Sequence, residues 1–423
     1  MMSIIPRGMR DYLPEETEKF ERIRDEFRQA CSLYGFKMME PSPLEMLSTL
    51  EAKSGPAIRD EIYHFRDKGG REVGLRFDLT VGLTRIASAD RAAPLPIKLA
   101  SFAGVFRYDE PQHARYRWFY QWDTEVYGSP NIEADAEVIE FTARFLSRCG
   151  LNDYVIKIGD RGIVQEFIQK HTGRNEEESI ELMRALDKVD KKTPEQLVKE
   201  YTEKGFKVDE IQQVLSFGKL EGKSDEVLQD LRDFGLKSSE RLEDLISLLN
   251  SSHVRHEVSM KIVRGIDYYT SIVFEAFDTN RMDLGSIAGG GRFDNLARIF
   301  GRNDLPATGV AGGVDRLMLA LEKGNVKRPS TTLYVAFTGN MLKEAIAITT
   351  KLRDGNLPVQ MDLQRRNLSK QLEAASKMGA KYAVMVLPEE YSKNYVVVKN
   401  LVEGKEEKVE VTSLYSYLAK AVV

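Results

Sequence analysis

Two distant stretches of the chain place arginines among strand-forming aromatic residues and hydrogen-bonding side chains. They read GVFRYDEPQHARYRWFYQWDTEVYG over residues 104–128 and RGIDYYTSIVF over residues 264–274. The planar fork of arginine matches two oxygens of a phosphate or a carboxylate. Acids, amides and phenols nearby suit a small polar ligand that carries both donors and acceptors. Together the two stretches favour an enzyme that binds an anionic nucleotide beside an amino acid.

The first stretch predicts a strand with one polar face. Alternate residues of a strand share a face, and the polar members of this one are Arg115, Arg117, Gln121, Asp123 and Glu125. Burying such a face without a ligand or partner groups would be costly. Trp118 and Tyr120 lie on the opposite face and can supply a core. Arg107 could grip a phosphate, although taken alone it is better explained by an exposed ion pair with Asp109 or Glu110.

A second candidate site is the string LRFDLT at residues 75–80. Asp78 and Thr80 have the same parity at the end of a predicted strand. A carboxylate and a hydroxyl so placed could bind an ammonium group. A plain strand terminus with a turn-forming aspartate explains the string equally well.

The second arginine-containing stretch offers Arg264, Tyr268 and Tyr269. Gly265 would leave room for a ligand to approach the backbone, and the phenols could hydrogen-bond a flat polar ring. Consecutive residues of a strand point to opposite faces, so at most one tyrosine is expected to face the ligand. The alternative is an aromatic strand that packs in a core.

Glycine-rich pieces follow. Residues 289–291 predict a turn, and residues 309–313 predict a strand that runs into a helix. Glycines there would let a flat base lie on a sheet while Arg316 reaches a phosphate tail. The alternative is a tight strand-to-helix turn with a surface arginine. The chain contains no G-x-x-x-x-G-K-S/T phosphate loop.

The elements that must position these residues follow from periodicity. Apolar residues at helical spacing predict helices over residues 14–34 and 134–149. Strand pairing is expected for two hairpin-like pairs, 62–65 with 73–77 and 99–108 with 115–128, followed by a strand at 154–158.

Two later regions differ in character. Residues 170–250 are rich in Lys and Glu with leucines at helical spacing, which predicts a small helical insertion. The stretch KGNVKRPS at 323–330 is the best domain boundary. Beyond it, strand-like and helical runs alternate, as in βαβ units with a largely parallel sheet. Arg365 and Arg366, with Lys370 and Lys377, give this part local positive charge that would suit an RNA backbone.

Composition limits the class of protein. The 423 residues allow two or three domains, and a net charge of −4 means that any RNA contact must come from local basic patches. Two cysteines and five scattered histidines predict neither a disulfide framework nor a metal held by the protein. Without a membrane-length apolar run or a secretory signal, a cytoplasmic protein is expected.

These strings together resemble the histidyl-tRNA synthetase family of class II aminoacyl-tRNA synthetases over nearly the whole chain. FRYDEPQHARYRWFYQ is similar to the family's motif 2 and TGVAGGVDRL to its motif 3, while RGIDYY and GGGRFDNL resemble its two histidine-specific signatures. The resemblance implies an α+β fold, with an antiparallel sheet flanked by helices. It implies a catalytic domain over residues 1–325, interrupted by the helical insertion, and an anticodon-binding α/β domain over residues 330–423.

The resemblance also implies roles for individual residues. The amino group of histidine would be held by Asp78, Thr80 and Gln121, and its imidazole by Glu125 and Tyr269, with Tyr268 beside them. Arg107 and Arg264 would be catalytic, gripping the carboxylate and the α-phosphate. Further ATP contacts would come from Asp109, Arg115 and Arg316. Contacts to tRNA would come from Gln112, Arg115, Arg365 and Arg366.

The implied partners are L-histidine, ATP with Mg²⁺, and tRNA(His), in a homodimer without membrane contact. The apolar face of the first helix would suit a dimer interface. Two departures stand out: Glu110 replaces a frequent arginine, and Asp78 a frequent glutamate. The main alternative is a catalytically silent, histidine-sensing paralogue, such as the regulatory subunit of ATP phosphoribosyltransferase. A synthetase for proline or threonine and a plain RNA-binding protein are further alternatives.

Overall fold

The computed structural model describes residues 5–54, 56–108, 116–189, 192–263, 268–321 and 333–422. The chain forms two compact units, Met1–Asn325 and Val326–Val423, and each is described by itself. Among the described residues no helix has the length and apolar character needed to cross a membrane.

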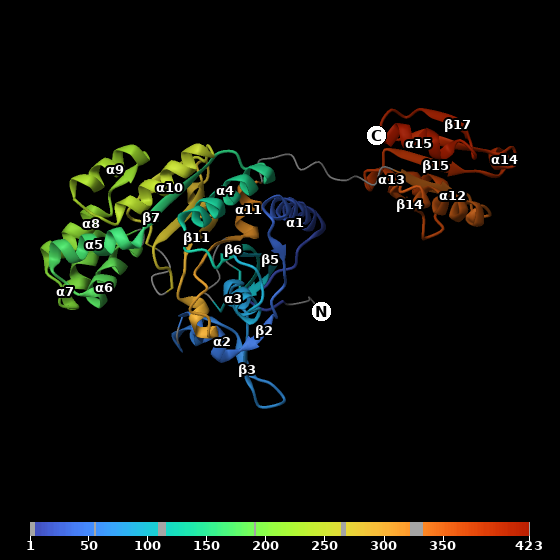
Figure 1. Cartoon of the computed structure of the whole chain (residues 1–423). Helices are drawn as coiled ribbons and strands as arrows, with labels where there is room; N and C mark the ends of the chain where they lie inside the picture. Colours follow the sequence, from blue (N-terminus) through green and yellow to red (C-terminus); the bar gives the residue numbers. More distant parts are fainter. Residues whose placement is uncertain are drawn as a thin grey trace. The chain divides into compact units, whose positions relative to one another are not determined.

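A mixed sheet organises the first unit (Figure 1). Its described strands lie in the order β1-β5-β6-β12-β11-β10-β7-β9-β8. All neighbours are antiparallel except the parallel pairs β1–β5 and β7–β9. This antiparallel-rich sheet confirms the α+β class. The strand bounds are β1 Lys37–Met38, β5 Ile97–Phe106, β6 Trp118–Tyr127, β7 Tyr154–Asp160, β8 Glu221–Gly222, β9 His256–Ser259, β10 Ile272–Asp278, β11 Ala288–Arg292 and β12 Ala307–Gly313.

One face of this sheet is closed by apolar packing. Helices α1 (Pro14–Tyr34), α4 (Ile132–Cys149) and α11 (Val314–Ala320) cover it. Trp122 of β6 packs there against Phe27 of α1 and Phe145 of α4, with ring centroids 5.9 and 4.8 Å away. The apolar face of α1 is therefore buried in the chain's own core, so the expectation that it would serve as a dimer interface is wrong.

The opposite face carries helix α3 (Thr80–Ala89) and the 3-10 turn η3 (Leu296–Phe300), which enclose a smaller apolar cluster. A three-stranded sheet in the order β2-β4-β3 lies beside them. The expected first hairpin is its β3–β4 pair. The remaining bounds here are β2 Leu44–Met46, α2 Leu47–Ser54, η1 Pro56–Glu61, β3 His64–Arg66, β4 Glu72–Leu75 and η2 Met282–Leu284.

The predicted turn at residues 289–291 is wrong, because these glycines form the middle of strand β11. A Cβ on Gly290 would lie 2.3 Å from the carbonyl oxygen of Gly309 and 2.6 Å from the ring of Phe274. Close packing between neighbouring strands, rather than a chain reversal, explains the glycines at this position.

The helical insertion follows β7 and forms the green and yellow-green helices of Figure 1. Its helices are α5 Arg161–Thr172, α6 Glu176–Asp187, α7 Pro194–Glu203, α8 Val208–Phe217, α9 Ser224–Asp233 and α10 Ser239–Ser251. Their buried leucines and phenylalanines are continuous with the core of the large sheet. Capping boxes at Asn175 and Thr193 begin α6 and α7.

The second unit has a sheet in the order β14-β13-β15-β16-β17. Its parallel trio confirms the predicted βαβ alternation, whereas β16 and β17 add an antiparallel edge that the sequence did not reveal. The bounds are β13 Leu333–Phe337, α12 Leu342–Asp354, β14 Val359–Met361, α13 Leu368–Lys377, β15 Tyr382–Val386, α14 Pro388–Tyr391, β16 Tyr395–Asn400, β17 Glu406–Glu410 and α15 Leu414–Val422.

Candidate functional site

A cavity of about 400 Å³ opens on the sheet of the first unit. That volume is in the range of small-molecule sites. Its walls come from segments distant in sequence: β6, β10, β11, β12, the start of α11 and the residues before β10. Its lining residues include Arg107, Phe119, Gln121, Tyr268, Tyr269, Glu275, Gly289, Ala311, Gly313, Asp315 and Arg316.

The floor of the cavity is a row of cross-strand neighbours. Asp123 pairs with Ala311, Ala311 with Gly289, and Gly289 with Glu275. Directly opposed residues in a sheet share a face, so a carboxylate stands at each end of a row of small residues. A flat ring can therefore approach the sheet between the two acids.

Two of the predicted arginines lie on this cavity. Arg107 donates from Nε to the carbonyl oxygen of Phe77 at 2.9 Å, and its guanidinium lies over the ring of Phe119, 5.2 Å from the centroid. Arg316 donates from Nη1 to the carbonyl oxygen of Ser286 at 2.8 Å. Both guanidinium groups are thus oriented by backbone oxygens. Arg264 lies outside the described residues.

Gln121 lies on the cavity wall with 8 % of its surface exposed. Its side-chain oxygen is buried, and no hydrogen-bond donor for it exists among the residues that the structure describes. An unsatisfied buried amide oxygen is costly, and a ligand N–H in the cavity would satisfy it.

Both Tyr268 and Tyr269 line the cavity, so the expectation that only one could face it is wrong. They precede β10 rather than belonging to it, and the two-residue alternation of a strand does not apply to them. Their rings lie side by side with centroids 4.0 Å apart.

The charges of three carboxylates act on the pKa of Tyr268. Burial raises the pKa of Tyr268 well above its usual value, the hydrogen bond with Tyr269 lowers it, and the charges of Asp78, Asp123 and Glu125 raise it further. Tyr268 therefore keeps its proton and can donate it in a hydrogen bond.

The predicted histidine-binding acids lie behind the cavity surface. Glu125 is 1 % exposed and accepts a hydrogen bond from Tyr127. Thr80 donates to Asp123 at 3.4 Å. Asp78 and Thr80 do not end a strand as expected: β4 stops at Leu75, Thr80 opens helix α3, and Asp78 accepts from the amide of Val81 at 3.3 Å.

Sequence reasoning missed two acids of the cavity. Glu275 interrupts the apolar run of β10, a signal that could have identified it, and it is 4 % exposed. Asp315 accepts from Tyr12 at 3.0 Å and from Arg10 at 3.3 Å, which ties the N-terminal segment to the start of α11. Burial raises the pKa of Asp315, while Tyr12 and Arg10 lower it.

The other predicted residues lie elsewhere. Asp109, Gln112 and Arg115 are outside the described residues. In the second unit Arg365 is exposed, whereas Arg366 donates to Asp362 at 2.6 Å and to the hydroxyl of Tyr334 at 3.3 Å.

Family comparison places the chain among the aminoacyl-tRNA synthetases. Residues 8–317 match the family described as histidyl-tRNA synthetase, and residues 330–421 match the anticodon binding domain. The chain belongs to the histidyl-tRNA synthetase family.

Similar proteins agree over nearly the full length. A protein of Pyrococcus furiosus named histidine–tRNA ligase is 38 % identical, with 98 % of each chain covered. One of Thermococcus kodakarensis with the same name is 38 % identical over 96 % of this chain and 95 % of its own. The crystal structure of histidyl-tRNA synthetase from Nostoc sp. PCC 7120 shares the fold, with a TM-score of 0.83 at 24 % identity and full coverage of both chains.

Proposed function

We propose that this protein is a histidine–tRNA ligase. It joins histidine to ATP, forming histidyl-adenylate and pyrophosphate, and then transfers histidine to the 3′ end of tRNA(His). The observation that carries the proposal is the meeting of Arg107, Arg316, Gln121 and the two tyrosines on one cavity, in a chain of this family.

Histidine would occupy the end of the cavity near β6. Gln121, with Asp78 and Thr80 behind it, would hold the amino group. Glu125 and Tyr269 would each take one imidazole nitrogen, with Tyr268 alongside. Support comes from the buried amide oxygen of Gln121 and from the carboxylates that act on Tyr268. A site that pairs both ring nitrogens rejects analogues lacking them, because its polar groups would stay unsatisfied.

ATP would lie over the small residues of the floor. Arg316 would hold the γ-phosphate, and Arg107 with Arg264 the reacting carboxylate and α-phosphate. Asp109 and Arg115 would add contacts from the motif 2 loop. Mg²⁺ would accompany the ATP phosphates and neutralise part of their charge, and Glu275 on the cavity wall offers a carboxylate of the kind that Mg²⁺ prefers.

The reaction needs no protein nucleophile. The carboxylate of histidine attacks the α-phosphorus, and the bond to pyrophosphate breaks. Two anions must approach, so positive groups fixed before the reaction stabilise the transition state. Arg107 and Arg316 meet this requirement, because backbone carbonyl groups already hold their side chains in place.

Contacts with tRNA would involve Gln112 and Arg115 at the acceptor end, and Arg365 and Arg366 in the second unit. The match of that unit to an anticodon binding domain supports this role. It also favours a ligase over a histidine-sensing paralogue. Arg365 is the better candidate for direct contact, since Arg366 is engaged with Asp362.

A cytoplasmic homodimer is the proposed assembly. The described part of the first unit exposes several large apolar side chains on and beside β1, β2 and β3: Met38, Met39, Leu44, Met46 and Phe65. Exposed large apolar side chains are typical of an interface when they form a contiguous patch, and these residues replace α1 as the proposed pairing surface.

The test is ATP–pyrophosphate exchange with each amino acid in turn, followed by charging of tRNA. Exchange is expected with histidine alone. Arg316→Ala is expected to lower the exchange rate about 100-fold or more, while Arg232→Ala, which removes an exposed arginine paired with Glu243, is expected to leave it unchanged. Exchange with another amino acid, or none with any, would refute the proposal.

A further inference from the structure

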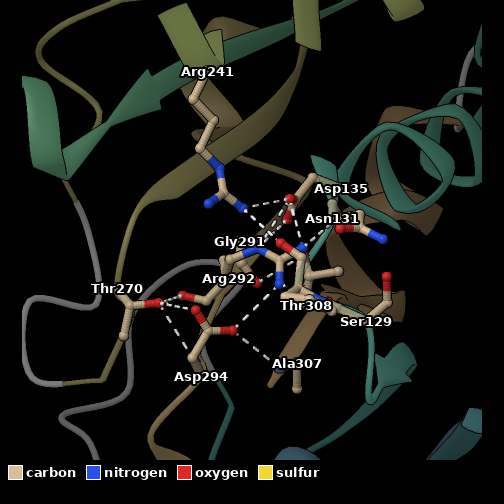
Figure 2. A network of polar contacts seen from close by, with 11 residues as sticks. Ser129, Asn131, Asp135, Arg241, Thr270, Gly291, Arg292, Asp294, Ala307 and Thr308 are labelled. Carbon is tan, nitrogen blue, oxygen red and sulfur yellow. Dashed lines mark hydrogen bonds and ion pairs between the residues drawn. The ribbon is translucent and has the colours of Figure 1, made fainter. Parts of the chain in front are cut away.

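Three consecutive residues, Arg292, Phe293 and Asp294, hold the segment that carries the two cavity tyrosines. Figure 2 shows Arg292 and Asp294 together with Thr270 of that segment. The amide of Thr270, next to Tyr269, donates to the carbonyl oxygen of Arg292 at 2.7 Å. The ring of Phe293 lies 6.1 Å from that of Tyr268 and 6.4 Å from that of Tyr269. The backbone and the rings of the tyrosine segment thus rest on the same short stretch.

The Thr270 hydroxyl strengthens this attachment. Its oxygen lies 3.3 Å from Oδ2 of Asp294 and 3.2 Å from the carbonyl oxygen of Arg292, so it can donate to either. It also accepts from the amide of Asp294 at 3.4 Å. Oδ1 of Asp294 accepts from the amide of Ala307 in β12 at 3.2 Å. Asp294 therefore bridges the tyrosine segment and the cavity floor.

Arg292 is itself fixed from behind. Its guanidinium is 1 % exposed and donates to both oxygens of Asp135 on α4, with a shortest distance of 2.7 Å. It also donates to the carbonyl oxygens of Ser129 and Asn131, at 2.8 and 2.9 Å, and to Asp294 at 3.3 Å. A buried ion pair with this many hydrogen bonds defines a single geometry at the cost of desolvating both charges.

The helical insertion reaches the same carboxylate. Arg241 of α10 lies 3.4 Å from Oδ2 of Asp135 and 3.5 Å from the carbonyl oxygen of Pro130 (Figure 2). Arg241 also acts on Asp160 at the end of β7. The pKa of Asp160 is raised to about 6, because burial raises it by more than the amides of Gly162 and Ile163 and the charge of Arg241 together lower it. The insertion and the tyrosine segment are thus joined through Asp135, Arg292 and Asp294.

We propose that Arg292, Asp294 and Thr270 are positioning residues for the amino-acid end of the cavity, and that Arg241 makes their geometry depend on the insertion. The inference rests on the proposed function, because it concerns the site assigned there to histidine. None of the four touches the substrate. They act by holding Tyr268 and Tyr269, since a loop needs such support to keep side chains in place within about 0.5 Å.

The first test separates the hydroxyl of Thr270 from its size. Thr270→Val keeps the shape and removes the hydrogen bonds, whereas Thr270→Ser keeps the hydroxyl. Thr270→Val is expected to raise the KM for histidine about tenfold in pyrophosphate exchange, with the KM for ATP changed less than about twofold. Thr270→Ser is expected to keep the histidine KM close to that of the unmodified protein. Unchanged histidine KM, or an equal rise in both KM values, would overturn the proposal.

A second variant covers the case in which Thr270→Val does not fold. Asp294→Asn keeps the shape but removes the charge that Thr270 and Arg292 face, and it is expected to give the same one-sided rise. If the unmodified protein shows no histidine-dependent exchange, the proposed function fails. If it does, and neither variant alters the histidine KM, only this inference fails.

The insertion is tested separately. Arg241→Ala is expected to raise the histidine KM about threefold, and the matched surface change Arg232→Ala to leave it unaltered. When two residues act through one network, the effect of the double variant is smaller than the product of the single effects. The histidine KM of the double variant Arg241→Ala with Thr270→Val should therefore be only slightly higher than that of Thr270→Val alone. If the rise in histidine KM of the double variant equals the product of the two single rises, Arg241 does not act through this network.

Discussion

Both faces of strand β6 are largely buried, but different groups complete their packing. On one face Trp122 and Val126 are covered by α1 and α4. On the other, Gln121, Asp123 and Glu125 are buried polar groups beside the cavity. The first face is closed by the chain's own apolar side chains. The second face has hydrogen-bonding groups that the ligand would satisfy. Substitutions at even-numbered positions of β6 should therefore affect mainly stability, and substitutions at odd-numbered positions mainly function.

Trp122→Ala gives the largest expected effect, on stability. The side chain is fully buried among phenylalanines, and removing it should lower the free energy of unfolding by about 3–5 kcal/mol. Urea denaturation followed by circular dichroism measures this. Trp118→Ala, at a half-buried position of the same face, should cost clearly less. An equal cost would contradict the comparison.

Glu125→Gln should act on function instead. It keeps the size of a buried side chain but removes the charge proposed to pair with an imidazole N–H, so the KM for histidine should rise about 100-fold, or about 2.7 kcal/mol. The KM for ATP and the urea midpoint should change little. Pyrophosphate exchange over a histidine series provides the measurement, and equal loss for both substrates would exclude the role.

Gln121→Ala should show the smallest functional effect, about a tenfold rise in the histidine KM. Because its buried oxygen has no donor among the described residues, stability without ligand should hold. Gln371 of α13 is the matched control. It accepts from the amide of Phe337 at 2.9 Å and donates to the carbonyl oxygens of Phe337 and Arg366, so Gln371→Ala should lower stability by about 1–3 kcal/mol. Similar losses in the two variants would break the distinction.

Local pattern was enough for the elements and for the polar face of β6. The helix at residues 14–34, the strand pair β5–β6 and the βαβ alternation after residue 333 all follow from periodicity. The prediction of a turn at the glycines of β11 failed, because a run of glycines is typical of a turn unless the neighbouring strands are known. The prediction that only one of Tyr268 and Tyr269 faces the cavity failed because it applied the alternation of a strand to residues that precede β10.

The candidate site was only partly accessible to such reasoning. Arg107, Gln121 and Arg316 were candidates from residue type and spacing, the family resemblance gave them their expected roles, and they share one cavity. The ion pair between Arg292 and Asp135 joins positions 157 residues apart. The local sequence around either residue does not predict the other as its partner. Contacts of this kind depend on the order of strands in the sheet, which periodicity does not specify.

The hydrogen bonds from Arg10 and Tyr12 to Asp315 span more than 300 residues. During synthesis, the N-terminal segment leaves the ribosome long before its partner exists, so this wall of the cavity cannot be completed until nearly all of the first unit has emerged. A nascent chain stopped just before residue 315 would hold the described strands of the large sheet but not the finished cavity. Binding competence should therefore arise late and abruptly in translation, rather than growing with chain length.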